Sequence, residues 1–183
     1  MLNAAYCGGV FLFSLYLQQQ RGQSALHAGL MFIPMTALVA VVNLASAKLA
    51  RLLGPRVPIV TGQLLATAGL LTLLTVGTHT HVWLAVALMV PVGLGGALTM
   101  PALTTMLLDA VPANRAGTTS AVLNTARQTG GATAVAAFGA LLTGTHAFLT
   151  AMRWSTLLAA TGLALTTTTT LTQLRTGRRN EEA

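Results

Sequence analysis

Long apolar stretches alternate with short polar segments along the whole chain. A helix needs roughly 20 apolar residues to cross a bilayer, and about six stretches approach or exceed that length. The stretches are too long for barrel strands, and open sheet edges are not tolerated in hydrocarbon. The pattern therefore predicts an all-α integral membrane protein. The predicted spans are residues 2–18, 28–47, 57–76, 82–108, 117–142 and 154–174, which form one six-span bundle over residues 1–174, followed by a polar tail over residues 175–183.

The positions of lysine and arginine predict the orientation of these spans. Cytoplasmic loops of membrane proteins carry an excess of basic residues. The second and fourth connections and the tail hold most of them, so we expect both termini in the cytoplasm and the bundle in the plasma membrane. The expected cytoplasmic group is Lys48, Arg51, Arg56, Arg115, Arg175, Arg178 and Arg179, against Arg21 and Arg153 outside.

Composition supports a lipid environment and argues against nucleic-acid binding. The chain is 54% hydrophobic and only 7% charged, whereas about a quarter of an average soluble domain is charged. The net charge of +7 comes from basic residues that apolar stretches separate, which is not how a nucleic-acid surface is built. We therefore expect the lipid bilayer, and no nucleic acid, as a partner.

The sequence contains no pattern that predicts an enzyme, a cofactor or a metal site. It has no phosphate-binding loop of the Walker type. The four histidines, His27, His79, His81 and His146, fall in predicted outer loops without neighbouring cysteine or carboxylate ligands. No carboxylate or histidine lies inside a predicted span. Since proton-coupled carriers need a titratable group within the membrane, this chain alone is not expected to couple transport to protons.

Arg127 is the one charge inside a predicted span, in the stretch "LNTARQTGGATAVAAFG". It follows Gly117 by ten residues, or roughly 15 Å of helix. Asn124 and Gln128 share its face of the helix. Two interpretations fit the sequence. Arg127 either lies in a cavity or interdomain contact, as a functional intramembrane charge, or it extends to the interface from a helix that protrudes.

Two further stretches predict local structure: one a basic loop with a tight turn, the other a span with a closely packed or bent helix. In "AKLARLLGPR", the cations Lys48, Arg51 and Arg56 meet the cytoplasmic leaflet, and Gly54 with the following proline makes a tight turn. In "VPVGLGGALTMPAL", glycines allow close helix packing, while proline can bend the span and open a cavity. The residues to which we assign packing or bending are Gly93, Gly95, Gly96, Pro101, Gly130 and Gly131.

These motifs, in this order, resemble the C-terminal half of a major facilitator superfamily transporter, and most of all a 14-span drug/proton antiporter of the EmrB/QacA type. The similar segments are "FLFSLYLQQQRGQSALHAGLMFIPM", "AKLARLLGPR", "GLGGALTMPAL" and "DAVPANRAGTTSAVLNTARQTGGATAVAAFGALL". Arg51 stands where the loop motif usually has an acidic residue, so an acidic role in that loop does not carry over.

The resemblance implies two three-helix inverted repeats that face a second bundle across a central cavity. It also implies that spans one, two, four and five line the cavity. The last span would then lie at the periphery, where its threonine hydroxyls can bond to carbonyls of their own helix. Candidate residues for the cavity or the contact between bundles are Tyr16, Gln18, Asn43, Asn124, Arg127 and Gln128.

The leading hypothesis is therefore half of a multidrug efflux transporter that exports small lipophilic compounds by proton antiport when joined to its missing N-terminal half. One alternative is a six-span facilitator that works as a homodimer. Another is a non-transporting membrane subunit or a truncated remnant, whose small-residue faces serve only helix association.

Overall fold

The computed structural model describes the backbone of residues 1–144 and 148–181 and the side chains of residues 1–143 and 148–172. Within this part every regular element is helical, so the all-α prediction is confirmed. The helices are α1 (Leu2–Leu15), α2 (Ala25–Met31), α3 (Ile33–Leu53), α4 (Arg56–Leu73), α5 (Val82–Asp109), α6 (Ala116–Gly144) and α7 (Phe148–Glu181). A π-helical segment, Tyr16–Gln20, follows α1, and a 3-10 turn, Ala113–Arg115, precedes α6.

Local sequence explains where the first helices begin and end. The Ser24 hydroxyl accepts a hydrogen bond from the His27 amide and caps α2, as a serine commonly does at a helix start. Pro34 stands in the first turn of α3, where its missing N–H costs nothing. Gly54 ends α3 with a φ of 81°, a conformation that favours glycine. The predicted span over residues 28–47 therefore corresponds to parts of two consecutive helices.

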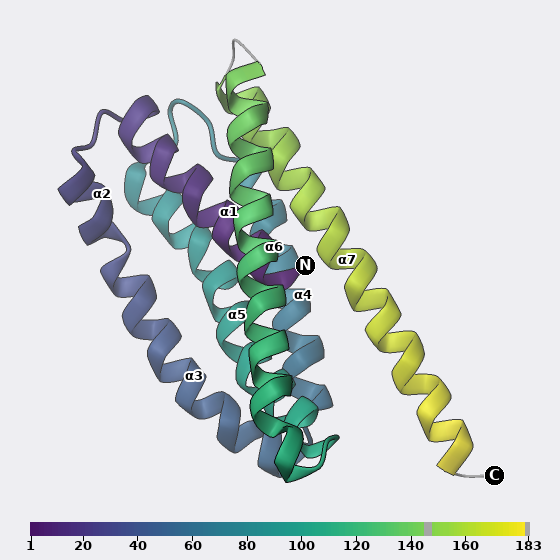
Figure 1. Ribbon diagram of the computed structural model, residues 1–183. Coiled ribbons are helices and arrows are strands. Elements are labelled where there is room, and N and C mark those ends of the chain that lie inside the picture. Colours follow the sequence, from purple (N-terminus) through teal and green to yellow (C-terminus); the bar gives the residue numbers. More distant parts are fainter. Residues whose placement is uncertain (145–147, 182–183) are drawn as a thin grey trace.

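The bundle is built on the pair α4 and α5, which pack against each other along their lengths. α3 packs on α5, α7 packs on α4, and α1 packs mainly on α6. Figure 1 shows α3 and α7 on opposite sides of the bundle, with the N-terminus partway along it and the C-terminus at one end. α3 buries only Met35 and Ser46, so most of its surface faces outward.

Four helical segments in the described part are long and apolar enough to cross a membrane: Ala25–Leu53, Arg56–Leu73, Val82–Asp109 and Phe148–Thr172. α6 has sufficient length, at 29 residues, but it carries Asn124, Arg127, Gln128 and several threonines. The chain is a multi-pass membrane protein, while the count of six spans and the inverted repeats stay predictions.

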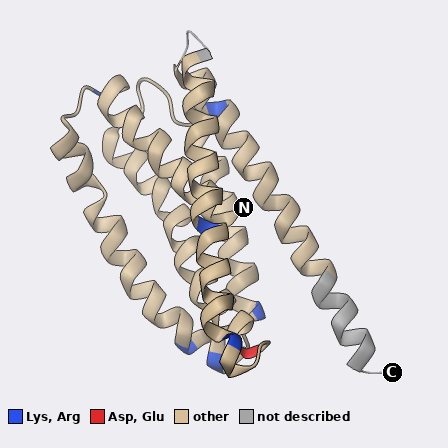
Figure 2. Cartoon of the chain, viewed as in Figure 1, with Lys and Arg blue, Asp and Glu red and all other residues tan. Residues whose placement is uncertain are grey.

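Charged residues gather at the two ends of the bundle, apart from one position on α6 (Figure 2). Lys48, Arg51, Arg56 and Arg115 are exposed around the α3–α4 and α5–α6 connections, which lie at the same end (Figure 1). Arg127 is the only basic residue within α6. The predicted tail over residues 175–183 and the loop residue His146 fall outside the residues whose side chains the structure describes.

A buried serine ties α3 to α5. The Ser46 hydroxyl is fully buried and donates to the Leu98 carbonyl at 2.6 Å. We expect Ser46→Ala to lower the free energy of unfolding by about 1 kcal/mol, the usual value of one such bond. The measurement is reversible unfolding in bicelles. Thr36→Ala is the matched control, because the exposed Thr36 hydroxyl bonds only to the Phe32 carbonyl of the preceding turn. Equal losses for both variants would contradict the prediction.

Candidate functional site

A cavity of about 160 Å³ lies where α1, α3, α5 and α6 converge. Its polar lining comes from three helices: Asn3 and Tyr6 on α1, Asn43 on α3, and Arg127 on α6. The remaining wall is apolar or small and consists of Leu2, Val39, Gly93, Gly96, Ala97 and Met100. The four helices that bound this cavity are those that the resemblance assigns to a central cavity.

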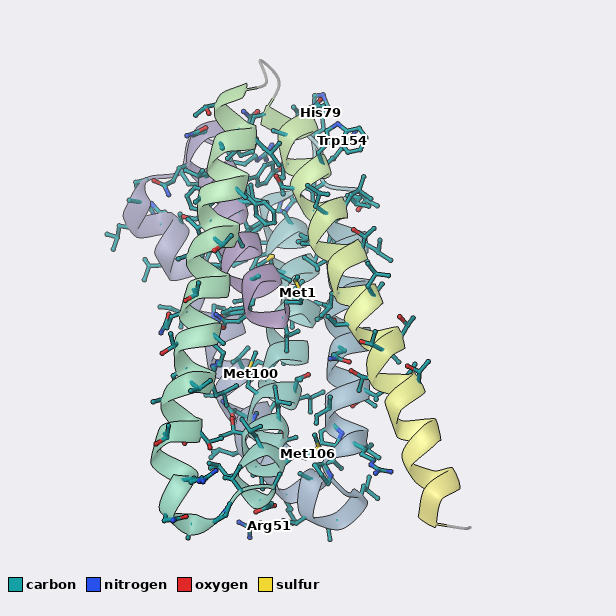
Figure 3. The ribbon with its side chains drawn as sticks, turned by 45° about the vertical axis from the view of Figure 1, so that its right-hand side comes forward. Met1, Arg51, His79, Met100, Met106 and Trp154 are labelled. Atoms are coloured by element: carbon teal, nitrogen blue, oxygen red, sulfur yellow. The ribbon has the colours of Figure 1, made fainter. Side chains whose placement is uncertain are left out.

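A second cavity, of about 410 Å³, adjoins the first and shares three of its lining residues, Asn43, Met100 and Arg127. Its other lining residues, Pro101, Thr104, Thr105 and Leu108, follow α5 toward its C-terminal end. Figure 3 shows Met100 between Met1 and the end of the bundle at which Arg51 lies. The combined space therefore extends from the middle of the bundle toward its basic end. We call it the Arg127 cavity.

A contact between α1 and α6 fixes the backbone at Arg127. The Asn3 side-chain amide donates to the Arg127 carbonyl at 2.7 Å. On the next turn of α6, the Cα of Gly131 lies against Asn3 and Cys7, and a Cβ there would come within 3.1 Å of both side chains. Absence of a side chain at Gly131 thus lets α1 approach closely enough for the Asn3 bond.

Arg127 is half-buried as a residue and has no acidic neighbour among the residues that line the cavity. Its lining residues, all within the described part of the chain, include no aspartate, glutamate or histidine. Arg127 stands 11 residues, or about 16 Å, from the start of α6 at Ala116. Arg127 lines both parts of the cavity, while its role as a functional intramembrane charge stays a prediction.

The structure separates the other polar candidates. Asn43 lines the Arg127 cavity, whereas Asn124 and Gln128 are exposed on α6 and line neither part of it. The buried Tyr16 hydroxyl donates to the Gly77 carbonyl at 2.9 Å, at the opposite end of the bundle. Gln18 donates to the Ser14 hydroxyl and carbonyl of its own helix. These last two side chains lie just after the C-terminal end of α1 and do not reach the cavity.

The three glycines of α5 have three different neighbours. A Cβ on Gly95 would overlap Ala66 and the Gly62 carbonyl of α4, and a Cβ on Gly93 would come within 2.9 Å of Val39 on α3. A Cβ on Gly96 would meet nothing within 4 Å, because Gly96 faces the cavity. α5 stays helical through Pro91 and Pro101. Gly130 comes closest to Ala4 of α1 and lines a separate groove among α1, α6 and α7.

Asn3 and Tyr6 are cavity residues that the sequence interpretation did not select. Their spacing of three residues places them on one face of α1, and this spacing was the available signal. The threonines of α7 behave as expected: Thr167 donates to the Leu163 carbonyl and Thr170 to the Thr166 carbonyl. In the described part of the chain, no three histidine, cysteine or carboxylate side chains come together as metal ligands.

Comparison with protein families identifies this architecture. The model of the Major Facilitator Superfamily matches residues 1–135. The chain belongs to the major facilitator superfamily. Membership in a transporter superfamily agrees with the prediction that the chain is not an enzyme. No solved structure was found to match the chain.

Several curated superfamily relatives are drug-resistance proteins. The chain is 30% identical over 142 residues to the methylenomycin A resistance protein of Streptomyces coelicolor, covering 78% of this chain and 30% of the relative. It is 34% identical over 138 residues to the multidrug resistance protein Stp of Mycobacterium tuberculosis, covering 75% and 26%. It is 29% identical over 142 residues to the tetracenomycin C resistance and export protein of Streptomyces glaucescens, covering 78% and 26%. The chain thus spans less than a third of the length of these relatives.

Proposed function

We propose that the chain is the C-terminal half of a multidrug efflux transporter of the major facilitator superfamily. In the complete protein, the N-terminal half covers the Arg127 cavity and rocks against α1, α3, α5 and α6 to give alternating access. The observation that carries this proposal is the polar cavity at the meeting point of these four helices. The drug-resistance relatives support drugs as the substrate class, and we expect small lipophilic compounds among them.

The orientation follows from the basic end of the bundle. We place Lys48, Arg51, Arg56 and Arg115 in the cytoplasm of a plasma-membrane protein, together with both termini of the chain. Because the cavity extends along α5 toward that end, it is accessible to compounds from inside the cell. The largely outward surface of α3 then faces the other half or lipid.

Proton antiport requires carboxylates or histidines inside the membrane, and the sequence has none within its six predicted spans. In the described part, the one acidic side chain is Asp109, exposed at the end of α5. We propose that the carboxylates that carry protons belong to the N-terminal half. The exchange of protons for drug is thus a property of the complete transporter.

Reconstitution of the purified 183-residue chain tests whether the proton-carrying groups belong to the other half of the transporter. We expect proteoliposomes of this chain to show no ethidium transport in response to a pH gradient above protein-free vesicles, because no carboxylate or histidine lies within its predicted spans. The complete reading frame, expressed in cells, should lower ethidium accumulation in a manner that a protonophore abolishes. Robust pH-driven transport by the chain alone would contradict the proposal, and pH-independent uptake together with dimer crosslinking would favour the homodimeric facilitator.

A further inference from the structure

The polar groups of the Arg127 cavity are dominated by hydrogen-bond donors. A guanidinium has five N–H donors and no acceptor, whereas the Tyr6 hydroxyl and the Asn3 and Asn43 amides can donate or accept, and Asn3 already donates to the Arg127 carbonyl. The only formal charge on the lining residues is that of Arg127, which is positive. A cationic compound would meet repulsion here, while an anion would meet a charged donor beside neutral ones. The cavity therefore selects the sign of charge of its ligand.

The described residues supply no hydrogen-bond acceptor and no ion-pair partner to the Arg127 guanidinium. A charge held at membrane depth without a partner is costly, and a planar guanidinium pairs most strongly with a carboxylate through two parallel bonds. The cavity also offers an apolar floor, formed by Gly93, Gly96, Ala97 and Met100. A flat apolar body that carries a carboxylate fits both features.

A second copy of this chain cannot supply that carboxylate at this depth. The acidic residues of the sequence are Asp109, Glu181 and Glu182. Asp109 is the last residue of α5, at the end of the bundle, and the two glutamates belong to the C-terminal nine residues. The carboxylate therefore comes from a small molecule or from a different polypeptide segment.

We propose that the Arg127 cavity is a carboxylate-binding site, filled by a lipophilic acid or by an acidic side chain of the other half of the transporter. This inference rests on the proposed function and refines it, because it concerns the same cavity: the group bound directly beside Arg127 is a carboxylate, whereas a cation such as ethidium binds elsewhere between the two halves. Binding itself is a property of this chain and can be measured without transport.

The test uses the purified chain in nanodiscs and measures the rate at which phenylglyoxal modifies each arginine, by peptide mass spectrometry. The probe is 2-naphthoate, and the control ligand is the neutral 2-naphthamide. We expect 2-naphthoate to slow modification of Arg127 at least fivefold and to leave the exposed Arg153 unchanged, while 2-naphthamide protects neither. Gly96→Leu, whose Cβ would meet nothing within 4 Å and whose side chain starts at the cavity wall, should abolish this protection in a chain that still folds.

A second arm distinguishes the two sources of the carboxylate. In membranes of the cells that naturally contain the chain, a protein carboxylate should protect Arg127 without any added probe, and amidation by a carbodiimide and taurine should remove that protection. Selective protection by 2-naphthoate, together with no carbodiimide-sensitive protection in native membranes, identifies a small-molecule site. The inference is overturned if 2-naphthamide protects as well as 2-naphthoate, or if neither probe protects and native membranes give no carbodiimide-sensitive protection. These protection measurements do not depend on transport. Each outcome can therefore be interpreted even if the proteoliposome and ethidium experiments contradict the proposed function.

Discussion

Gly95→Leu is expected to abolish folding of the bundle, whereas Gly96→Leu leaves it folded. A Cβ at position 95 would lie 2.6 Å from the Ala66 Cβ and 2.7 Å from the Ala66 backbone nitrogen, and it would overlap the Gly62 carbonyl. Backbone atoms cannot yield as a flexible side chain can, so α4 and α5 must separate. Overpacking typically costs about 1–3 kcal/mol and occasionally more, and a clash with backbone atoms belongs to the costly cases. The measurement is the yield of monodisperse protein in detergent, followed by thermal unfolding.

Gly96→Leu is the matched control, because Gly96 is the next residue of α5 and differs from Gly95 in the direction that its side chain would take. Gly96 has nothing within 4 Å of its added Cβ and lines the cavity, so a leucine there does not start against a neighbouring helix. We expect yield and unfolding temperature close to those of the parent chain. A stable Gly95→Leu protein, or equal loss of yield in both variants, would show that the α4–α5 contact does not decide stability.

These two positions also show what the sequence could predict about the fold. The length of the apolar stretches was sufficient to predict the all-helical architecture, because only helices and closed barrels satisfy the backbone hydrogen bonds in hydrocarbon. The motif "VGLGG" predicted close packing or a bend, but not which glycine faces which helix. That assignment depends on the rotation of α5 about its axis, which its neighbours determine. An almost uniformly apolar helix such as α5 carries no polar stripe in its sequence to define that rotation.

The candidate site was predictable where a residue is chemically conspicuous. Arg127 stands out as the one charge in an apolar stretch, and the structure places it beside Asn43 in one cavity. Tyr16 and Gln18 have equally polar side chains, but their bonds to Gly77 and Ser14 lie at the other end of α1. Asn3 was missed because an asparagine near the start of an apolar stretch does not by itself reveal the carbonyl to which it donates.

Arg127→Gln is expected to reduce export by the complete transporter at least tenfold for substrates that carry a carboxylate, and much less for neutral substrates. Glutamine keeps donors of similar reach but removes the charge. A hydrogen bond to a charged group contributes about 1.5–3 kcal/mol, and 1.4 kcal/mol corresponds to a factor of ten. The measurements are drug susceptibility and initial efflux rates in cells, normalised to the amount of transporter in the membrane.

The matched control is Arg153→Gln, which removes an exposed arginine near the start of α7, outside the residues that line the Arg127 cavity. It should insert and export like the parent protein. If Arg127→Gln inserts normally and exports every substrate at the parental rate, the Arg127 charge has no role in transport, and the carboxylate-binding proposal is wrong. If export of neutral and acidic substrates falls alike, Arg127 serves the contact between the two halves, because loss of an interdomain carboxylate pair impairs rocking regardless of cargo. Selective loss of acidic substrates places the carboxylate on the transported compound.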